Sequence, residues 1–232
     1  MPRVVVLGCG TAVGKTRVSV ALLRGLSRAR CRTIGLKPIE TGVAPKGNPP
    51  PDSDAYALAQ AGSMRPSMAH PLFAFPEPIS PHAAARMLQL EIALTPIVSW
   101  VEEAEQCVAP LVSSDMASWS VVETAGGVFS PLSQSTTNFA LALALEPAIW
   151  IVVAADALGA LHEVTATLEA MRARGREPNH VVLSAAREPD ASTGSNAREL
   201  SALGIVTPVA TLARNDDRGI EALVERLLTR AP

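Results

Sequence analysis

The fold is decided by the stretch Val4-Val5-Val6-Leu7-Gly8-Cys9-Gly10-Thr11-Ala12-Val13-Gly14-Lys15-Thr16. Its first four residues form an apolar run typical of a buried strand, and residues 16–30 carry apolar side chains at helical spacing. The glycines between them let backbone N–H groups face an anion, and the helix N-terminus adds partial positive charge. A strand, a glycine-rich loop and a helix in this order predict a site for the phosphates of a nucleotide.

The polar residues that end this loop have distinct expected roles. Lys15 is expected to reach the β- and γ-phosphates, and the hydroxyl of Thr16 to bind Mg2+. Gly8 and Gly14 enclose five residues, one more than the standard motif has. The alternative is a glycine-rich turn that meets Lys-Thr by chance, but the strand before it and the helix after it argue against this.

The rest of the chain alternates short apolar runs with segments of helical spacing. The apolar runs are 4–7, 33–36, 120–122, 149–153, 181–183 and 206–212. The helical segments are 16–30, 54–61, 96–113, 137–145, 161–174, 194–203 and 217–229. This order predicts an α/β fold in which helices cover both faces of a parallel sheet. We expect one domain over residues 1–232, with long functional or mobile loops at the proline-rich stretches 45–53 and 64–81.

Charge and composition limit the classes of molecule that the chain is expected to bind. Twenty basic and 22 acidic residues leave a net charge of −2, so no overall positive field would draw the chain to nucleic acid or anionic lipid. No apolar run approaches the roughly 20 residues of a membrane span, and the first strand starts just after Met1, so we expect a cytoplasmic protein. The three cysteines lie far apart, which predicts neither a disulfide framework nor a zinc site, and we expect all three to be buried.

Two carboxylates and a second lysine follow predicted strands, where parallel sheets bind their ligands. Glu123 ends one strand, and Asp54 opens a helix after the first long loop, where its alternative role is a helix cap. Hard oxygens of this kind suit Mg2+. Lys37 ends the second strand, where its charge is costly unless it meets an anion; the alternative is a pair with Glu40 or Asp54.

The chain resembles dethiobiotin synthetases in five segments that occur in the same order. These are Gly8 to Thr16 with its five-residue spacing, Lys37-Pro38-x-x-Thr41-Gly42, Ser53-Asp54, Pro78-Ile79-Ser80-Pro81-His82, and Val122-Glu123-Thr124-Ala125-Gly126-Gly127 with Pro131-Leu132. Leu158-Gly159-Ala160-Leu161-His162 is a looser sixth match. The resemblance covers nearly the whole chain and implies a three-layer P-loop NTPase fold with a mostly parallel central sheet.

The resemblance also implies the reaction and its residues. Family members convert 7,8-diaminopelargonate, CO2 and ATP to dethiobiotin, ADP and phosphate through a phosphorylated carbamate, in biotin biosynthesis. Lys37, Lys15 and Thr11 would surround the carbamate and the travelling phosphate, where cations stabilise developing charge. Thr16, Asp54 and Glu123 would hold Mg2+, and Thr41 and Ser80 would touch the diamine. The nucleotide would be bound by Gly8, Ala12, Val13, Gly14, Lys15, Thr16, Arg17, Asp54, Glu123, Gly126, Ala185 and Ala213.

The family works as a homodimer, in which the far carboxylate of the substrate meets a helix N-terminus of the other subunit. Here Gly159, Ala160 and Leu161 would supply that terminus, whose unpaired N–H groups favour an anion. His162 stands where the family has Asn. It can donate a hydrogen bond to the substrate or, alternatively, lie in solvent as a first-turn histidine.

The expected base pocket departs most from the family. Ala185 and Ala186 stand where an Asn-Asp pair commonly reads adenine, and Leu212-Ala213 replaces a later Ile-Pro element. A site without such polar groups cannot penalise the wrong base, so we expect other nucleoside triphosphates to replace ATP with little loss. The alternative is that backbone groups around Leu212 and Ala213 read the base.

Other functions stay open at this point. One is a related P-loop synthetase or amidoligase that acts on another substrate. Another is an ATPase switch of the ParA/MinD type, which needs an extra lysine early in the loop, where Cys9-Gly10-Thr11 has none. A third is an inactive nucleotide-binding paralogue, against which the presence of Lys15, Lys37 and both carboxylates argues.

Overall fold

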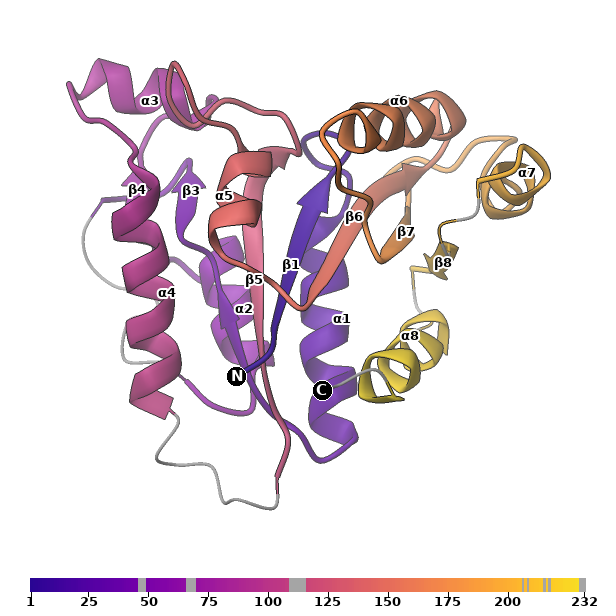
Figure 1. The fold of residues 1–232 in the computed structure, drawn as a ribbon, viewed down its shortest axis with the longest axis horizontal. Coiled ribbons are helices and arrows are strands. Elements are labelled where there is room, and N and C mark those ends of the chain that lie inside the picture. Colours follow the sequence, from indigo (N-terminus) through magenta and orange to yellow (C-terminus); the bar gives the residue numbers. More distant parts are fainter. Residues whose placement is uncertain are drawn as a thin grey trace.

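The computed structural model describes residues 1–45, 49–65, 70–108, 116–205, 207, 209–214, 216 and 218–229. Its main element is a six-stranded sheet of order β2-β5-β1-β6-β7-β8, in which all neighbouring strands are parallel (Figure 1). The strands are β1 Arg3–Gly8, β2 Arg32–Leu36, β5 Ser118–Gly127, β6 Ile149–Asp156, β7 His180–Ala185 and β8 Val209–Leu212. A second, two-stranded parallel sheet pairs β3 Ile39–Thr41 with β4 Phe73–Phe75.

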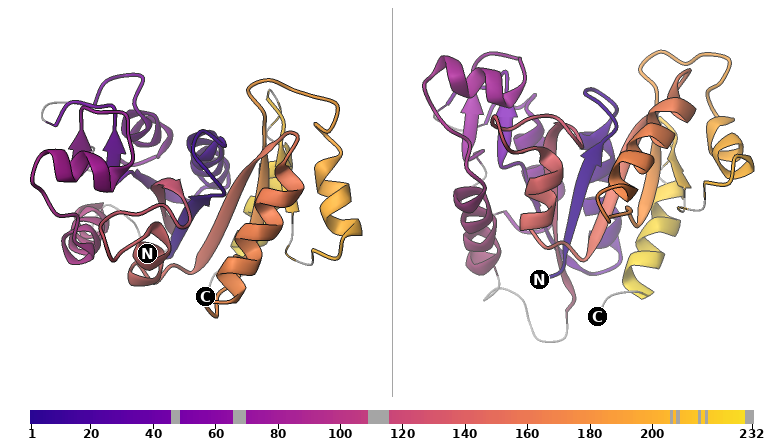
Figure 2. Two further views of the ribbon diagram at one scale, coloured as in Figure 1. Left: turned by 90° about the horizontal axis from the view of Figure 1, so that it is seen from above. Right: turned by 45° about the horizontal axis from the view of Figure 1, so that its top comes forward.

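Helices cover both faces of the main sheet, as Figure 2 shows from two sides. They are α1 Lys15–Arg28, α2 Asp54–Ala61, α3 Pro81–Met87, α4 Leu94–Val108, α5 Asn138–Ala144, α6 Ala160–Arg172, α7 Asn196–Ala202 and α8 Arg218–Thr229. Successive residues of β1 point to opposite faces. Val4 and Val6 pack in one apolar cluster with α1, α2 and α8, while Val5 and Leu7 pack in another with α4 and α5. Burial on both faces explains why the strands read as continuous apolar runs.

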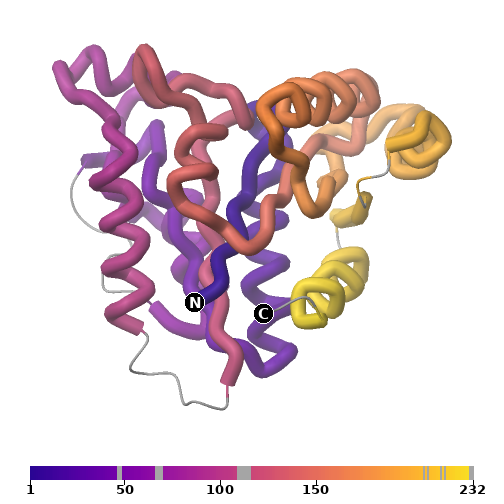
Figure 3. Tube along the Cα trace, in the orientation of Figure 1, coloured from indigo at the N-terminus to yellow at the C-terminus, as the bar shows by residue number. Residues whose placement is uncertain are grey.

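The central strands place the phosphate loop at one end of the molecule. β1 lies between β5 and β6, and its amino end lies at the opposite end of the sheet (Figure 3). The register of β2 against β5 pairs Leu36 with Val122. Lys37, directly after β2, and Glu123, directly after Val122, therefore lie side by side. The prediction that Glu123 ends its strand is wrong, because β5 continues to Gly127.

The predicted three-layer fold is confirmed, with corrections in detail. Residues 206 and 208 of the predicted strand 206–212 lie outside the described residues, as does residue 217 of the last predicted helix. The same holds for 46–48 and 66–69 of the two loops and for 109–113 of the third predicted helix. The stretch 64–81 is not entirely loop, because it contains β4 and ends where α3 begins. Burial of all three cysteines is wrong: Cys31 is buried, Cys9 half-buried and Cys107 exposed on the outer face of α4. Among the described helices, none combines the length and apolar character needed to cross a bilayer.

Candidate active site

The phosphate loop has a backbone that only glycine fits at its last turn. Gly14 caps α1 with φ of 92°, and a Cβ added there would lie 2.3 Å from Ser184 Oγ. Gly8 is equally constrained, since its added Cβ would lie 2.7 Å from the carbonyl oxygen of Gly10. No side chain caps the first turn of α1, so its N–H groups are open to an anion.

Lys15 begins α1 and is almost fully buried. Its Nζ lies 3.4 Å from the carbonyl oxygen of Gly10, and no described carboxylate lies within ion-pair distance. Burial lowers the pKa of Lys15, and the nearby charge of Lys37 lowers it further. A buried ammonium without an anionic partner is costly, so the site is built to receive negative charge.

Lys37 has the opposite surroundings. Its buried Nζ lies 2.9 Å from Asp54 Oδ2 and 2.5 Å from Glu123 Oε1. Burial alone would lower the pKa of Lys37, but the charges of Glu123 and Asp54 outweigh it and raise this pKa. The same ammonium, against the effect of burial, lowers the pKa of Asp54. Asp54 is therefore charged at neutral pH beside the Lys37 ammonium.

Oxygen atoms from three elements converge beside this ion pair. Thr16 Oγ1, on α1, lies 2.7 Å from Asp54 Oδ1 and 2.9 Å from Glu123 Oε1. A hydroxyl has one proton, so it can donate to only one of these oxygens at a time. Three hard oxygens with excess negative charge are a donor set that fits Mg2+, which usually takes only one or two protein carboxylates. The described residues contain no cluster of three or more His, Cys, Asp or Glu that would suggest another metal.

Two cavities adjoin each other here, and the first borders this cluster. One, of about 450 Å3, runs along the phosphate loop past Lys15, Thr16, Arg17, Lys37 and Asp54. The other, of about 230 Å3, leads to Ser80 and Ser130. Both are lined by Thr11, Thr41, Ala125 and Gly126, so the residues predicted for phosphoryl transfer and for the diamine share one continuous site.

A third cavity, of about 440 Å3, lies beyond the carboxyl ends of β7 and β8. Ala185, Ala186 and Ala213 line it, as the prediction of a base pocket requires. It neighbours the phosphate loop, because Gly14 abuts Ser184 and the Arg17 guanidinium donates to the carbonyls of Leu212 and Ala213.

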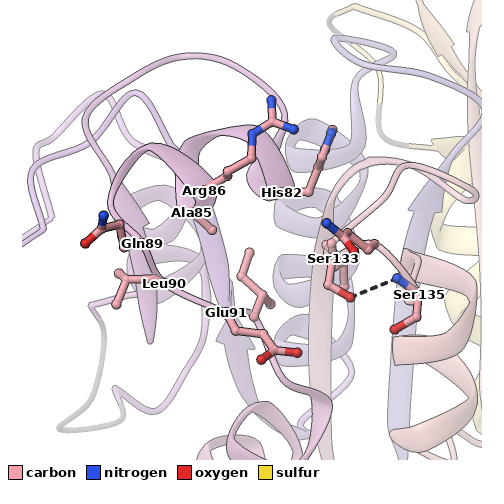
Figure 4. A pocket seen from close by; sticks show the side chains of 11 residues that line it. His82, Ala85, Arg86, Gln89, Leu90, Glu91, Ser133 and Ser135 are labelled. Atoms are coloured by element: carbon pink, nitrogen blue, oxygen red, sulfur yellow. Dashed lines mark hydrogen bonds between the residues drawn. The ribbon is translucent and has the colours of Figure 1, made fainter.

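A fourth cavity, of about 600 Å3, is bounded by α3 and by the segment that follows β5 (Figure 4). His82 and Arg86 face it from α3, and Ser133 and Ser135 from the other side. Its described lining residues differ from those of the phosphate and diamine cavities. No predicted site residue lines it.

The predicted carboxylate-binding segment stands apart from the other site residues within one chain. Gly159 caps α6 with φ of 98°, no side chain caps the helix, and Leu158 before it is 86% exposed. His162 lies in the first turn and is exposed. In the described chain, residues 159–162 line none of the four cavities.

Known proteins are similar to this chain in sequence or in fold. A family model described as an AAA domain matches residues 2–220. The ATP-dependent dethiobiotin synthetase BioD of Anaeromyxobacter sp. (strain K) is 36% identical over 214 residues, which cover 91% of this chain and 90% of that protein. The chain belongs to the dethiobiotin synthetase family. The same enzyme of Ralstonia nicotianae is 36% identical over 73% of this chain and 70% of its own. The predicted family and the predicted class of enzyme, an ATP-dependent ligase, are confirmed.

Solved structures with lower identity share the fold of this family member. HypB from Helicobacter pylori in complex with nickel has a TM-score of 0.54 at 14% identity, and covers 99% of this chain and 86% of its own. The MinC:MinD cell division protein complex of Aquifex aeolicus has a TM-score of 0.54 at 9% identity, and covers 100% of this chain and 98% of its own. Identities this low show the P-loop fold and nothing about function.

Ser19 and Glu40 support the synthetase site; the sequence did not single out Ser19, and it offered Glu40 only as a partner of Lys37. Ser19 donates to Glu123 Oε2 at 2.8 Å, and it lies one turn after Thr16 on the same face of α1. Glu40 does not pair with Lys37; its carboxylate accepts from the N–H groups of Asp54 (2.6 Å) and Ala55 (3.0 Å). Burial raises the pKa of Glu40. Glu40 thus fixes the start of α2 and, through it, the position of the Asp54 carboxylate.

Proposed function

We propose that the chain is an ATP-dependent dethiobiotin synthetase, which joins 7,8-diaminopelargonate and CO2 into a cyclic urea in cytoplasmic biotin synthesis. The observation that carries the proposal is the position of Lys37, which lies between two carboxylates and lines the phosphate cavity. That cavity shares four lining residues with the diamine cavity. Residues 1–232 would act as one domain. The family relationship supports the same substrates.

The phosphates would lie along the loop from Gly8 to Thr16 and at the open N-terminus of α1. Lys15 would donate to the β- and γ-phosphates, which gives its buried charge a partner. Arg17 and Gly126 border the same cavity, and the base would enter the third cavity beside Ala185 and Ala213.

Thr16, Asp54 and Glu123 would hold Mg2+. The bound ion would neutralise phosphate charge and orient the triphosphate. Ser19 and Glu40 position these ligands, the first through Glu123 and the second through the start of α2.

The reaction needs an anion-binding site rather than a side-chain nucleophile. One amine of the diamine attacks CO2 and loses a proton to give a carbamate, whose oxygen takes the γ-phosphoryl group as ADP leaves. The second amine then attacks the carbonyl carbon, and phosphate leaves with closure of the ring. Lys37, Lys15 and Thr11 would donate to the carbamate and phosphoryl oxygens, and Thr41 and Ser80 would orient the diamine.

The far carboxylate of the substrate would be bound by a second copy of the chain. The uncapped start of α6, at Gly159, Ala160 and Leu161, offers backbone N–H donors, with His162 next to them. These residues line neither site cavity of their own chain, and Leu158 beside them is exposed. Both features support a homodimer in which each subunit completes the other's site.

A labelled product tests the proposal. The protein is incubated with 7,8-diaminopelargonate, 13C-bicarbonate, ATP and Mg2+, and the product is analysed by mass spectrometry. We expect dethiobiotin that carries one 13C atom, with loss of product in the Lys37→Gln variant. Absence of labelled dethiobiotin with folded, nucleotide-binding protein would contradict the proposal.

A further inference from the structure

The third cavity offers a nucleotide base few side-chain groups that could distinguish one base from another. Its walls are apolar at Leu183, Ala185, Ala186, Leu212 and Ala213. Adenine and cytosine carry an exocyclic amino group where hypoxanthine and uracil carry an oxygen. A site that separates these bases needs an acceptor aimed at the amino group. Thr193 and Thr211 add hydroxyls to the lining, but a hydroxyl both donates and accepts, so it suits an amino and an oxo group alike. The backbone carbonyls at the cavity are acceptors only.

Two arginines already donate hydrogen bonds to backbone carbonyls at this cavity. The Arg214 guanidinium, which lines the cavity, donates to the carbonyl oxygens of Ala186 at 3.0 Å and Arg187 at 2.6 Å. Arg17, which does not line this cavity, donates to the carbonyl oxygens of Leu212, at 3.1 Å, and Ala213. Backbone acceptors just after β7 and at the end of β8 are therefore engaged before any nucleotide binds.

A carboxylate also lines the cavity, but its oxygens are used elsewhere. Asp156 is buried at the end of β6, and its oxygens accept from Gly194 N at 2.9 Å and from Asn196 Nδ2 at 2.7 Å. It holds the segment before α7 in place. Asp156 therefore does not replace the engaged carbonyls as a reader of the amino group.

A carbonyl that carries a guanidinium is a poor partner for an amino group. One of its acceptor positions is filled, and the positive charge beside it repels the partly positive amino hydrogens of the base. The guanidinium is itself rich in N–H donors, and every base has ring nitrogens or oxygens that can accept from it. Such a surface holds any base without distinguishing an amino from an oxo substituent.

We propose that Arg214, together with the carbonyl contacts of Arg17, is a specificity-determining residue that makes this synthetase tolerant of the nucleotide base. The inference rests on the proposed function, because it takes the third cavity as the base site. Arg214 is the residue to vary, since Arg17 also borders the phosphate cavity.

The test compares nucleotides that differ mainly by one amino-to-oxo exchange: ATP with ITP, and CTP with UTP. Binding is measured by displacement of a fluorescent ATP analogue, and kcat/KM is measured with diamine and bicarbonate as co-substrates. For the unaltered protein we expect the ATP-to-ITP and CTP-to-UTP ratios to lie within about tenfold. Arg214→Met frees the carbonyl of Ala186 and is expected to raise both ratios about fivefold or more, through tighter binding of ATP and CTP. Arg187→Met is the matched control: it removes an exposed arginine that does not line the cavity, and it should leave the ratios unchanged.

Two outcomes would overturn the inference. One is a preference of the unaltered protein for ATP over ITP of a hundredfold or more. The other is an Arg214→Met variant with unchanged ratios. If that variant does not fold, Arg214→Lys takes its place, with an expected smaller rise because Lys lacks the planar fork. If the proposed function is wrong, no nucleotide will support turnover. The binding ratios of ATP to ITP and of CTP to UTP still test the inference in that case.

Discussion

Replacement of Lys37 by Met should show how much the ion pairs of Lys37 stabilise the fold. The substitution removes an ammonium 2.9 Å from Asp54 and 2.5 Å from the fully buried Glu123. Loss of one partner of a buried ion pair costs about 3–5 kcal/mol, and we take about 3 because Asp54 is partly exposed. In a chain of this size, that lowers Tm by roughly 6–12 °C.

Lys15→Met is the matched control, since it replaces the other buried lysine of the site by the same residue. Lys15 has no described carboxylate within ion-pair distance, and burial lowers its pKa, so its charge costs stability in the free protein. We expect Lys15→Met to unfold at or above the urea concentration that unfolds the unaltered protein. Lys37→Met should unfold well below it.

Added Mg2+ should reduce the difference in stability to urea between Lys37→Met and the unaltered protein. Without Lys37 the two carboxylates face each other with no ammonium between them, so a divalent cation should bind more tightly than in the unaltered protein. Binding at 100 times Kd stabilises a fold by about 2.7 kcal/mol. The assay is urea unfolding followed by circular dichroism in EDTA and in MgCl2. Equal stabilisation of both proteins by Mg2+, or Lys37→Met as stable as the unaltered protein in EDTA, would refute the reasoning.

Three further predictions concern stability and reactivity. Glu105→Ala leaves Arg3 without its bidentate partner at the amino end of the sheet, and should cost about 3 kcal/mol in urea unfolding without changing kcat of the folded enzyme. Gly14→Ala must adopt a φ of 92° and approach Ser184, so we expect a loss of at least about 1–3 kcal/mol and of nucleotide binding, measured by calorimetry. Burial raises the pKa of Cys9 to about 11, so at pH 8 its alkylation, followed by peptide mapping, should be about a hundredfold slower than that of an ordinary thiol and should speed up on unfolding.

The sequence predicted the core of the site because strand ends carry its chemistry. An apolar run, five residues between two glycines and Lys15-Thr16 are local features, and the structure has them as β1, a loop and the start of α1. Lys37 and Glu123 lie side by side because β2 and β5 are parallel neighbours, and Asp54 reaches them from the start of α2. Whether Lys37 pairs with Glu40 or with the others depends on the pairing of β2 with β5, which no local pattern states.

Other parts had no sequence signal. β3 and β4 are three residues long, too short to show an alternation of apolar residues, and β4 lies in the proline-rich stretch 64–81. The contacts of Arg17 and Arg214 are with backbone carbonyls, which every residue has, so no residue type marks them. Exposure of Cys107 depends on which face of α4 turns to solvent, and the sequence alone did not settle this.

The most direct test of the central claim is the coupling of phosphate release to both co-substrates. Purified protein with ATP and Mg2+ is assayed with diaminopelargonate and bicarbonate together, and with each omitted in a CO2-free buffer. We predict release of one phosphate per dethiobiotin formed with both present, and only background release when either is missing. Phosphate release that is independent of the diamine would contradict the account and point to an ATPase of another kind.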